Sequence, residues 1–208
     1  NRSLSRYLEE IGDFEPLQFP NWAPYIKTKA LAEKLVNEAS AVGFRTTVIK
    51  PPLIWAADSH MMDDVFDLIK KGKFSLIDHG NYKFSAIHAL NVCHAVIKAS
   101  EKSESGTSYF VTDGQDYVFK DFFKAILTKK GISLPTRSVP FFFAWRIAPF
   151  IEFFWKAFNL KSDPPLSRQM VRMIGKPFTI NIDRARKDFG YSPIVNFEQG
   201  LSEFRRTD

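Results

Sequence analysis

The chain has 208 residues and a formal net charge of +6, and hydrophobic residues make up 45% of it. This length and composition are ordinary for a globular protein with one good core or two small domains. The positive charge permits contact with nucleic acid or an anionic membrane, but no Lys/Arg run exceeds two residues and no nucleic-acid motif occurs, so we expect no nucleic-acid partner.

Cysteine usage points to a reducing compartment. The single cysteine, Cys93, excludes a disulfide within the chain, and it lies in an apolar helical stretch where we expect a small buried side chain. The sequence has no zinc-ligand spacing and no signal peptide, and it does not begin with Met. We therefore predict no metal site and a cytoplasmic protein, with membrane association as an alternative.

Helical and strand patterns alternate along the chain. Apolar residues three and four apart indicate helices, and short β-branched or aromatic runs bounded by turn residues indicate strands. These patterns predict helices over 5–11, 25–41 (closed by Gly43), 61–71, 91–100, 119–130, 183–189 (capped by Asp183) and 197–205. They predict strands over 44–50, 74–77, 84–87, 107–112 and 179–182. The alternation predicts an α/β architecture.

The first of the long helices brings a tyrosine and a lysine together. Pro24 suits the first turn of a helix, and Tyr25 and Lys29 are four residues apart, so their side chains share one helical face. A fixed cation beside a phenol favours the phenolate, and such a phenol can exchange a proton with an alcohol or a carbonyl. The alternative is an exposed tyrosine beside a solvated lysine.

The segment 139–158 is unusually aromatic, with seven phenylalanines and two tryptophans. Its length is close to that of a membrane span, but Arg146, Glu152, Lys156 and the internal Pro149 argue against spanning. We expect an interfacial helix that makes peripheral membrane contact or a flap over an apolar ligand, with a core helix as the alternative.

Five segments carry a resemblance to a known family, namely 24–29, 48–56, 77–92, 111–122 and 183–193. The first matches a Tyr-x-x-x-Lys helix, the second a strand and loop, the third a Ser-x-Ile-His segment, the fourth an Asp-Gly turn, and the last a closing Gly-Tyr-x-Pro signature. In this order they resemble the extended short-chain dehydrogenase/reductase family, or NAD-dependent epimerase/dehydratase superfamily, and most of all its 3β-hydroxysteroid and sterol dehydrogenase branch.

The chain departs from the family pattern in several places. Lys50 stands where the family usually has Arg, and Trp55-Ala56 replaces its Tyr-Gly. The ten glycines include no Gly-x-x-Gly-x-x-Gly turn to hold a pyrophosphate, and Ser3 and Ser5 do not follow an apolar strand as the family's catalytic serine does. We therefore expect the chain to be the C-terminal part of a longer enzyme.

The resemblance implies a two-part fold. We expect the C-terminal part of a Rossmann-type doubly wound parallel sheet, with the catalytic helix, over approximately 1–50 and 78–112. A smaller mixed α/β substrate-binding subdomain is expected over approximately 51–77 and 113–208. The resemblance also suggests a homodimer formed through the Tyr25 helix.

The resemblance also assigns roles to residues. Tyr25 would be the general acid/base, Lys29 would assist it and hydrogen-bond the nicotinamide ribose, and the backbone of Pro51, Pro52 and Leu53 would lie near the nicotinamide of NAD or NADP. His88 could face a small-molecule substrate, although a lone histidine is more often structural. The substrate side would depend on the aromatic segment, including Phe141 and Trp145.

Three functions remain open at this point. The aromatic segment favours an NAD(P)-dependent oxidoreductase acting on a hydrophobic, sterol-like secondary alcohol or ketone. Arg168, Arg172 and Lys176 keep a sugar-nucleotide epimerase, dehydratase or reductase as an alternative, because such substrates need cationic partners. The missing glycine turn favours a third reading, a non-catalytic binding or membrane-associated module.

Overall fold

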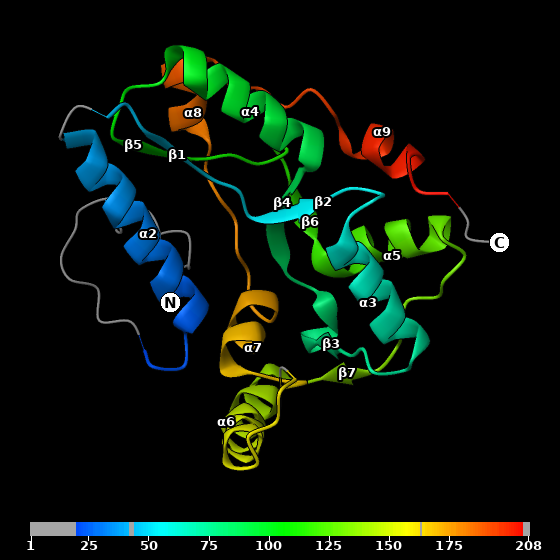
Figure 1. The fold of residues 1–208 in the computed structure, drawn as a ribbon. Coiled ribbons are helices and arrows are strands. Elements are labelled where there is room, and N and C mark those ends of the chain that lie inside the picture. The colour runs from blue at the N-terminus through cyan, green and yellow to red at the C-terminus, as the bar shows by residue number, and fades with distance from the viewer. Residues whose placement is uncertain (1–19, 42–43, 163, 206–208) are drawn as a thin grey trace.

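The computed structural model of the protein describes residues 20–41, 44–162 and 164–205. The helix predicted over 5–11, the serines Ser3 and Ser5 and the helix cap predicted at Gly43 lie outside these residues. Figure 1 shows three small sheets with helices packed around them.

The first sheet is a parallel pair. Strand β1 (Thr47–Lys50) lies beside β5 (Thr107–Phe110), and Thr47 is opposite Thr107 in the register. Helices α2 (Pro24–Ala41), α4 (Ala89–Lys102) and α8 (Asp183–Phe189) accompany this pair. Its core is a cluster of buried residues that includes Ala95, Tyr109, Val111, Phe189 and Tyr191, together with Ile87 from the neighbouring strand 83–88.

The second sheet has three strands in the order β2 (Leu53–Trp55), β4 (Lys83–His88) and β6 (Asp116–Val118). Strand β2 runs parallel to β4, and β6 runs antiparallel to it. Helices α3 (His60–Lys70), α5 (Phe119–Lys129) and α9 (Phe197–Ser202) cover an aromatic core around Trp55, which is fully buried. Strand β4 falls in one of the two predicted parts, while β2 and β6 fall in the other, so the proposed division runs through a shared sheet.

The third region lies at the bottom of Figure 1 and carries the aromatic segment. A short parallel pair, β3 (Leu76–Ile77) and β7 (Ser138–Val139), is followed by the helices α6 (Phe141–Ala157) and α7 (Arg168–Ile174). The turn η2 (Asp78–Gly80) follows β3, and the Asp78 carboxylate accepts a 2.8 Å hydrogen bond from the Phe141 N–H at the start of α6. No helix in the described ranges is both long and apolar enough to cross a bilayer.

The predicted long helices and most strands are present, but three local predictions are wrong. Cys93 is exposed, because α4 buries the face of Asn91, Ala95 and Ala99, and a residue two positions away from these points elsewhere. The segment 179–182 forms no strand, since it meets β4 only through one bridge at Phe178 and the Ser85 hydroxyl.

The third wrong prediction concerns the start of α8. Asp183 is the first residue of the helix rather than its cap, and its N–H is bound by the Asn181 side chain at 2.6 Å. Four elements had no prediction, namely β2, β6, β7 and α7.

Candidate functional site

Tyr25 and Lys29 lie on the same face at the start of α2, as their spacing predicts. The Lys29 ammonium nitrogen lies 5.6 Å from the centre of the Tyr25 ring, and the Tyr25 side chain is 52% exposed. An exposed phenol next to a cation is open to a ligand from solvent. The geometry therefore permits the proton exchange expected of this pair, and also permits a solvated surface contact.

Gln169, which no sequence pattern predicted as a site residue, contacts the first turn of α2. The Tyr25 N–H donates a 3.0 Å hydrogen bond to Oε1 of Gln169, on α7. The N–H groups in the first turn of a helix have no acceptor within the helix itself, and Gln169 supplies one from 144 residues away. No local pattern could have revealed this contact.

The aromatic segment reaches the same end of α2. Trp145 of α6 packs edge-on against Trp22, three residues before Tyr25, with ring centres 5.2 Å apart. Phe141 stacks on Trp145 at 5.9 Å, and the Lys176 ammonium lies 3.9 Å from the centre of the Phe141 ring. Of the predicted substrate residues, Phe141 and Trp145 therefore belong to one aromatic group beside the start of α2.

An ion pair between Glu152 and Arg168 joins α6 to α7. The two Glu152 oxygens accept hydrogen bonds from the Arg168 N–H at 2.7 Å and from its Nε at 2.8 Å, and Nη2 of Arg168 is 2.8 Å from Oε2. Both side chains are partly buried, at 32% and 20% exposure, so the pair is better shielded from solvent than a surface ion pair. We infer that α6 and α7 act as one unit.

Pro51 and Pro52 connect β1 to β2, and Leu53 is the first residue of β2. The two prolines have no N–H, so their backbone can offer only carbonyl groups to a ligand. Leu53 packs against the aromatic core around Trp55. Just before them, the Lys50 ammonium lies 2.9 Å from the Glu33 carboxylate of α2, which fixes the carboxyl end of β1 against the helix that carries Tyr25.

Packing, rather than a ligand, accounts for the position of His88. Its side chain is 1% exposed, and its ring centre lies 4.8 Å from that of Trp55. Gly200 of α9 packs closely against the His88 ring, since a Cβ atom added at Gly200 would come within 2.9 Å of it. Nε2 of His88 lies 3.3 Å from a Glu203 carboxylate oxygen but makes no hydrogen bond among the described residues. These contacts match the structural role that a lone histidine most often has.

Asp113 has a larger role than that of a turn residue. Its two buried oxygens accept hydrogen bonds from the His88 N–H, the Asn91 amide, the Trp55 indole and the Tyr117 hydroxyl, at 2.7 to 3.0 Å. This carboxylate joins β2, β4, α4 and the strand β6 at the centre of the fold. The nearby Asp113 charge and, above all, burial raise the pKa of the Tyr117 hydroxyl.

The helix α6 leaves most of its aromatic side chains uncovered. Only Ala144 and Ala148 are fully buried on it. Five of its phenylalanines are at least half exposed, namely Phe142, Phe143, Phe150, Phe153 and Phe154, and so is Phe158 directly after the helix. The core-helix alternative for this segment is therefore wrong.

Over the described ranges, no three His, Cys, Asp or Glu side chains gather closely enough to hold a metal ion.

A family profile and two curated relatives match most of the chain. The sequence profile of the 3-beta hydroxysteroid dehydrogenase/isomerase family matches residues 12–141. The 4-hydroxy-2-methyl-3-oxo-4-farnesyl-3,4-dihydroquinoline-1-oxide ketoreductase of Stigmatella aurantiaca is 34% identical over 97% of the chain. The sterol-4-alpha-carboxylate 3-dehydrogenase (decarboxylating) of Dictyostelium discoideum is 32% identical over 91% of it. The chain spans 60% and 58% of the length of these two relatives.

Solved structures show the same fold at lower identity. A nucleoside-diphosphate-sugar epimerase from Pseudomonas aeruginosa superposes with a TM-score of 0.63 at 14% identity, over 92% of this chain and 58% of that one. A UDP-glucuronic acid 4-epimerase from Bacillus cereus gives 0.61 at 14% identity, over 90% of this chain and 52% of that one. These likenesses confirm the predicted α/β fold of Rossmann type.

Proposed function

The chain belongs to the 3-beta hydroxysteroid dehydrogenase/isomerase family, and from that premise we propose that the whole protein is an NAD(P)-dependent oxidoreductase acting on a hydrophobic secondary alcohol or ketone. Membership confirms the family that the five motifs predicted. The observation that carries the proposal is the exposed Tyr25 ring beside Lys29, at the edge of an aromatic group. Relatives named as a ketoreductase and a sterol dehydrogenase support the class of reaction and the apolar substrate.

Each residue of the pair has its own task. The Tyr25 hydroxyl gives its proton to the developing alkoxide during reduction and takes the alcohol proton during oxidation. The Lys29 ammonium, 5.6 Å from the centre of the Tyr25 ring, would donate a hydrogen bond to the nicotinamide ribose. The nicotinamide itself, when bound, supplies or accepts the hydride.

The chain's residues fit the nicotinamide end of such a cofactor. Lys29 makes no ion pair among the described residues, so its ammonium is available to a ribose hydroxyl. The Pro51 and Pro52 carbonyls and the Leu53 backbone follow the carboxyl end of β1, which is where α/β sheets bind ligands. We assign no residue of this chain to the pyrophosphate, because the sequence has no glycine-rich turn, and we propose NAD or NADP without choosing between them.

A sugar-nucleotide substrate has less support. Of the three cations that favoured it, Arg168 is paired with Glu152, and Lys176 lies on the Phe141 ring. A diphosphate would need to displace these contacts. An apolar ring system needs no such change beside Phe141 and Trp145, and we propose that these two residues border the substrate.

The arrangement of parts also remains a proposal. We propose a Rossmann-type part over about 1–50 and 78–112 and a substrate-binding part over about 51–77 and 113–208, joined through β4.

An apolar stripe on α2 supports a homodimer through this helix. It consists of the exposed side chains Leu31, Leu35 and Val36. A Leu35→Glu variant should then lower the mass measured by light scattering, and an unchanged mass would contradict this interface.

The uncovered phenylalanines of α6 support peripheral contact with a membrane. Arg146 and Lys156 lie on the same helix, so an anionic surface would meet both apolar and cationic groups. Such contact would bring the aromatic group beside Tyr25 close to a source of apolar substrates.

The substrate class is tested by steady-state assays on the protein expressed from its complete gene. We expect reduction of NAD or NADP with a 3β-hydroxysterol or a comparable secondary alcohol, and none with UDP- or dTDP-sugars. Turnover of the sugar nucleotides alone would overturn the proposed substrate class, while turnover of neither would overturn the proposed enzyme.

A further inference from the structure

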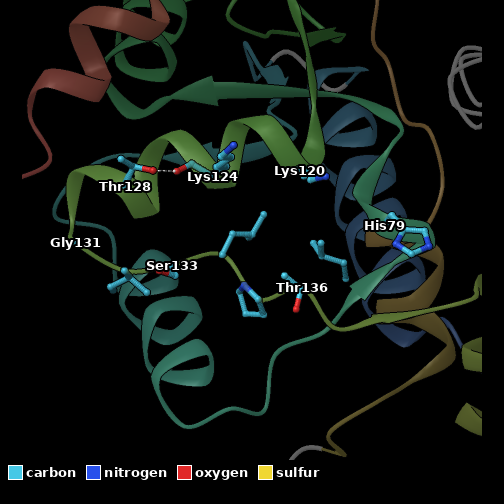
Figure 2. Close-up of a pocket in the computed structure, with 11 residues that line it drawn as sticks. His79, Lys120, Lys124, Thr128, Gly131, Ser133 and Thr136 are labelled. Carbon is cyan, nitrogen blue, oxygen red and sulfur yellow. Dashed lines mark hydrogen bonds between the residues drawn. The ribbon is translucent and has the colours of Figure 1, made fainter.

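A pocket of about 570 Å³ lies beside helix α5. It is formed by one face of α5, by the segment 131–136 that runs back along this helix, and by residues at and after β3 (Figure 2). None of the residues that line it belongs to the site around Tyr25. The side chains that line the pocket therefore determine what it can bind.

One wall is a row of polar side chains on α5. Lys120, Lys124 and Thr128 are spaced four residues apart, so they lie along the same helical face, as Figure 2 shows. Neither lysine makes an ion pair within the described part of the chain, and no Asp or Glu lines the pocket. The wall thus presents two cations that have no countercharge of their own.

The floor and the facing wall are different in character. Leu76 is 3% exposed and forms the base of the pocket together with the partly buried Ile132, Leu134 and Pro135. Ser133 and Thr136 add hydroxyl groups on the facing segment. An occupant would therefore meet cations on the side of α5, and both apolar groups and hydroxyls on the side of the segment 131–136.

The rim next to β3 has an unusual backbone. Asp78 and His79 both have positive φ angles, 45° and 58°, which non-glycine residues rarely adopt and which cost free energy. Two contacts hold this turn: the His79 N–H donates to Ser138 Oγ at 2.8 Å, and Asp78 accepts from the Phe141 N–H at 2.8 Å. The strained turn keeps the His79 imidazole at the mouth of the pocket.

We propose that this pocket binds an amphiphilic anion, which is a carboxylate or phosphate group attached to an alkyl or acyl body. The apolar body would lie over Leu76, Ile132 and Leu134, and its burial would supply most of the affinity. The anionic head would lie between the ammonium groups of Lys120 and Lys124, where charge-assisted hydrogen bonds are available. Such a ligand could be free in solution or could be the headgroup region of a membrane lipid.

The test uses amide NMR spectra of the 208-residue chain with three dissolved probes: octanoate, octanol and inorganic phosphate. Octanoate has both required parts and should shift the Gly131, Ser133 and Thr136 signals at lower concentration than either of the others. Vesicles containing phosphatidylglycerol identify the source, because a lipid ligand would shift or broaden these signals with vesicles while dissolved octanoate acts weakly.

Matched variants separate this pocket from unspecific binding. Lys120→Ala with Lys124→Ala should weaken octanoate binding by about tenfold, since two charge-assisted contacts are lost. Lys102→Ala with Lys129→Ala removes the same charge outside the pocket and should leave the affinity unchanged. Equal binding of octanol and octanoate, equal effects of the two double variants, or shifts confined to α6 would each overturn the proposal.

Discussion

The backbone N–H of Tyr25 donates a 3.0 Å hydrogen bond to the side-chain oxygen of Gln169. Gln169 lies on α7, which the Glu152–Arg168 pair fastens to α6. The aromatic segment proposed to border the substrate is therefore connected, through α7, to the residue proposed to transfer the proton.

Gln169→Leu removes the acceptor for the Tyr25 N–H and leaves that group without a protein partner. A neutral hydrogen bond contributes about 0.5–1.5 kcal/mol, so we expect kcat to fall by about threefold to tenfold as the start of α2 loosens. Steady-state kinetics on the protein from its complete gene measures this change.

The matched control for that variant is Gln169→Glu, which keeps an acceptor oxygen at the same reach. It should retain most of the wild-type kcat. If both variants lose activity equally, the hydrogen bond is not what positions Tyr25.

Asp113→Ala should strongly destabilise the fold. It leaves four buried donors without their acceptor, from Trp55, His88, Asn91 and Tyr117. We expect the free energy of unfolding, measured in urea, to fall by about 3–5 kcal/mol. The control Asp58→Ala, at an exposed loop position, should change it by less than about 0.5 kcal/mol. Similar values for the two variants would show that the network around Asp113 adds little stability.

Alkaline pH should destabilise the protein through its buried tyrosines. Burial, and then the Asp113 charge, raises the pKa of Tyr191, whose hydroxyl donates to the Thr112 carbonyl. The unfolded chain loses this proton near pH about 10 while the folded chain keeps it, so stability is fully present below that pH and falls above it.

The Tyr191→Phe variant isolates this contribution. The slope of unfolding free energy against pH, between about 10 and 11.5, should become shallower by about 1.4 kcal/mol per pH unit. Titration of lysines affects both proteins alike and cancels in the comparison. Identical slopes would mean that Tyr191 ionises equally in both states.

The exposed aromatic face of α6 predicts binding to vesicles. Changing Phe150, Phe153 and Phe154 to Ser removes large apolar surface that is 54% to 67% exposed, so the fold should be unaffected while co-sedimentation with anionic vesicles falls by at least about tenfold. The control changes the exposed Leu90, Val96 and Ile97 on α4 to Ser. A loss of sedimentation that is the same for both variants would contradict membrane contact through α6.

Local patterns predicted the long helices and the Tyr25–Lys29 pair, because periodicity and a spacing of four residues are properties of neighbouring residues. The same reasoning missed β2, β6 and β7, since strands of two or three residues show no periodicity. It placed Cys93 on the wrong face of α4, because an apolar stretch does not specify which side meets the sheet.

The parts of the site that depend on distant partners left no mark in the sequence. Gln169 lies 144 residues from Tyr25, and Asp113 collects donors that lie 4 to 58 residues away. An aspartate before a glycine is ordinary in a turn, so only the fold shows that this one is buried. The family motifs supplied what local patterns lacked, namely the order of elements and a candidate reaction.

The most direct test of the proposed function is the rate of hydride transfer in a Tyr25→Phe variant of the protein from its complete gene. The phenyl ring keeps the contact with Lys29 and removes only the hydroxyl, so NAD(P)H binding, followed by fluorescence, should be unchanged. We predict a fall in kcat of at least about a hundredfold, which is the contribution expected of a positioned acid/base group. Turnover within about twofold of wild type, at unchanged cofactor affinity, would show that Tyr25 does not carry the proton.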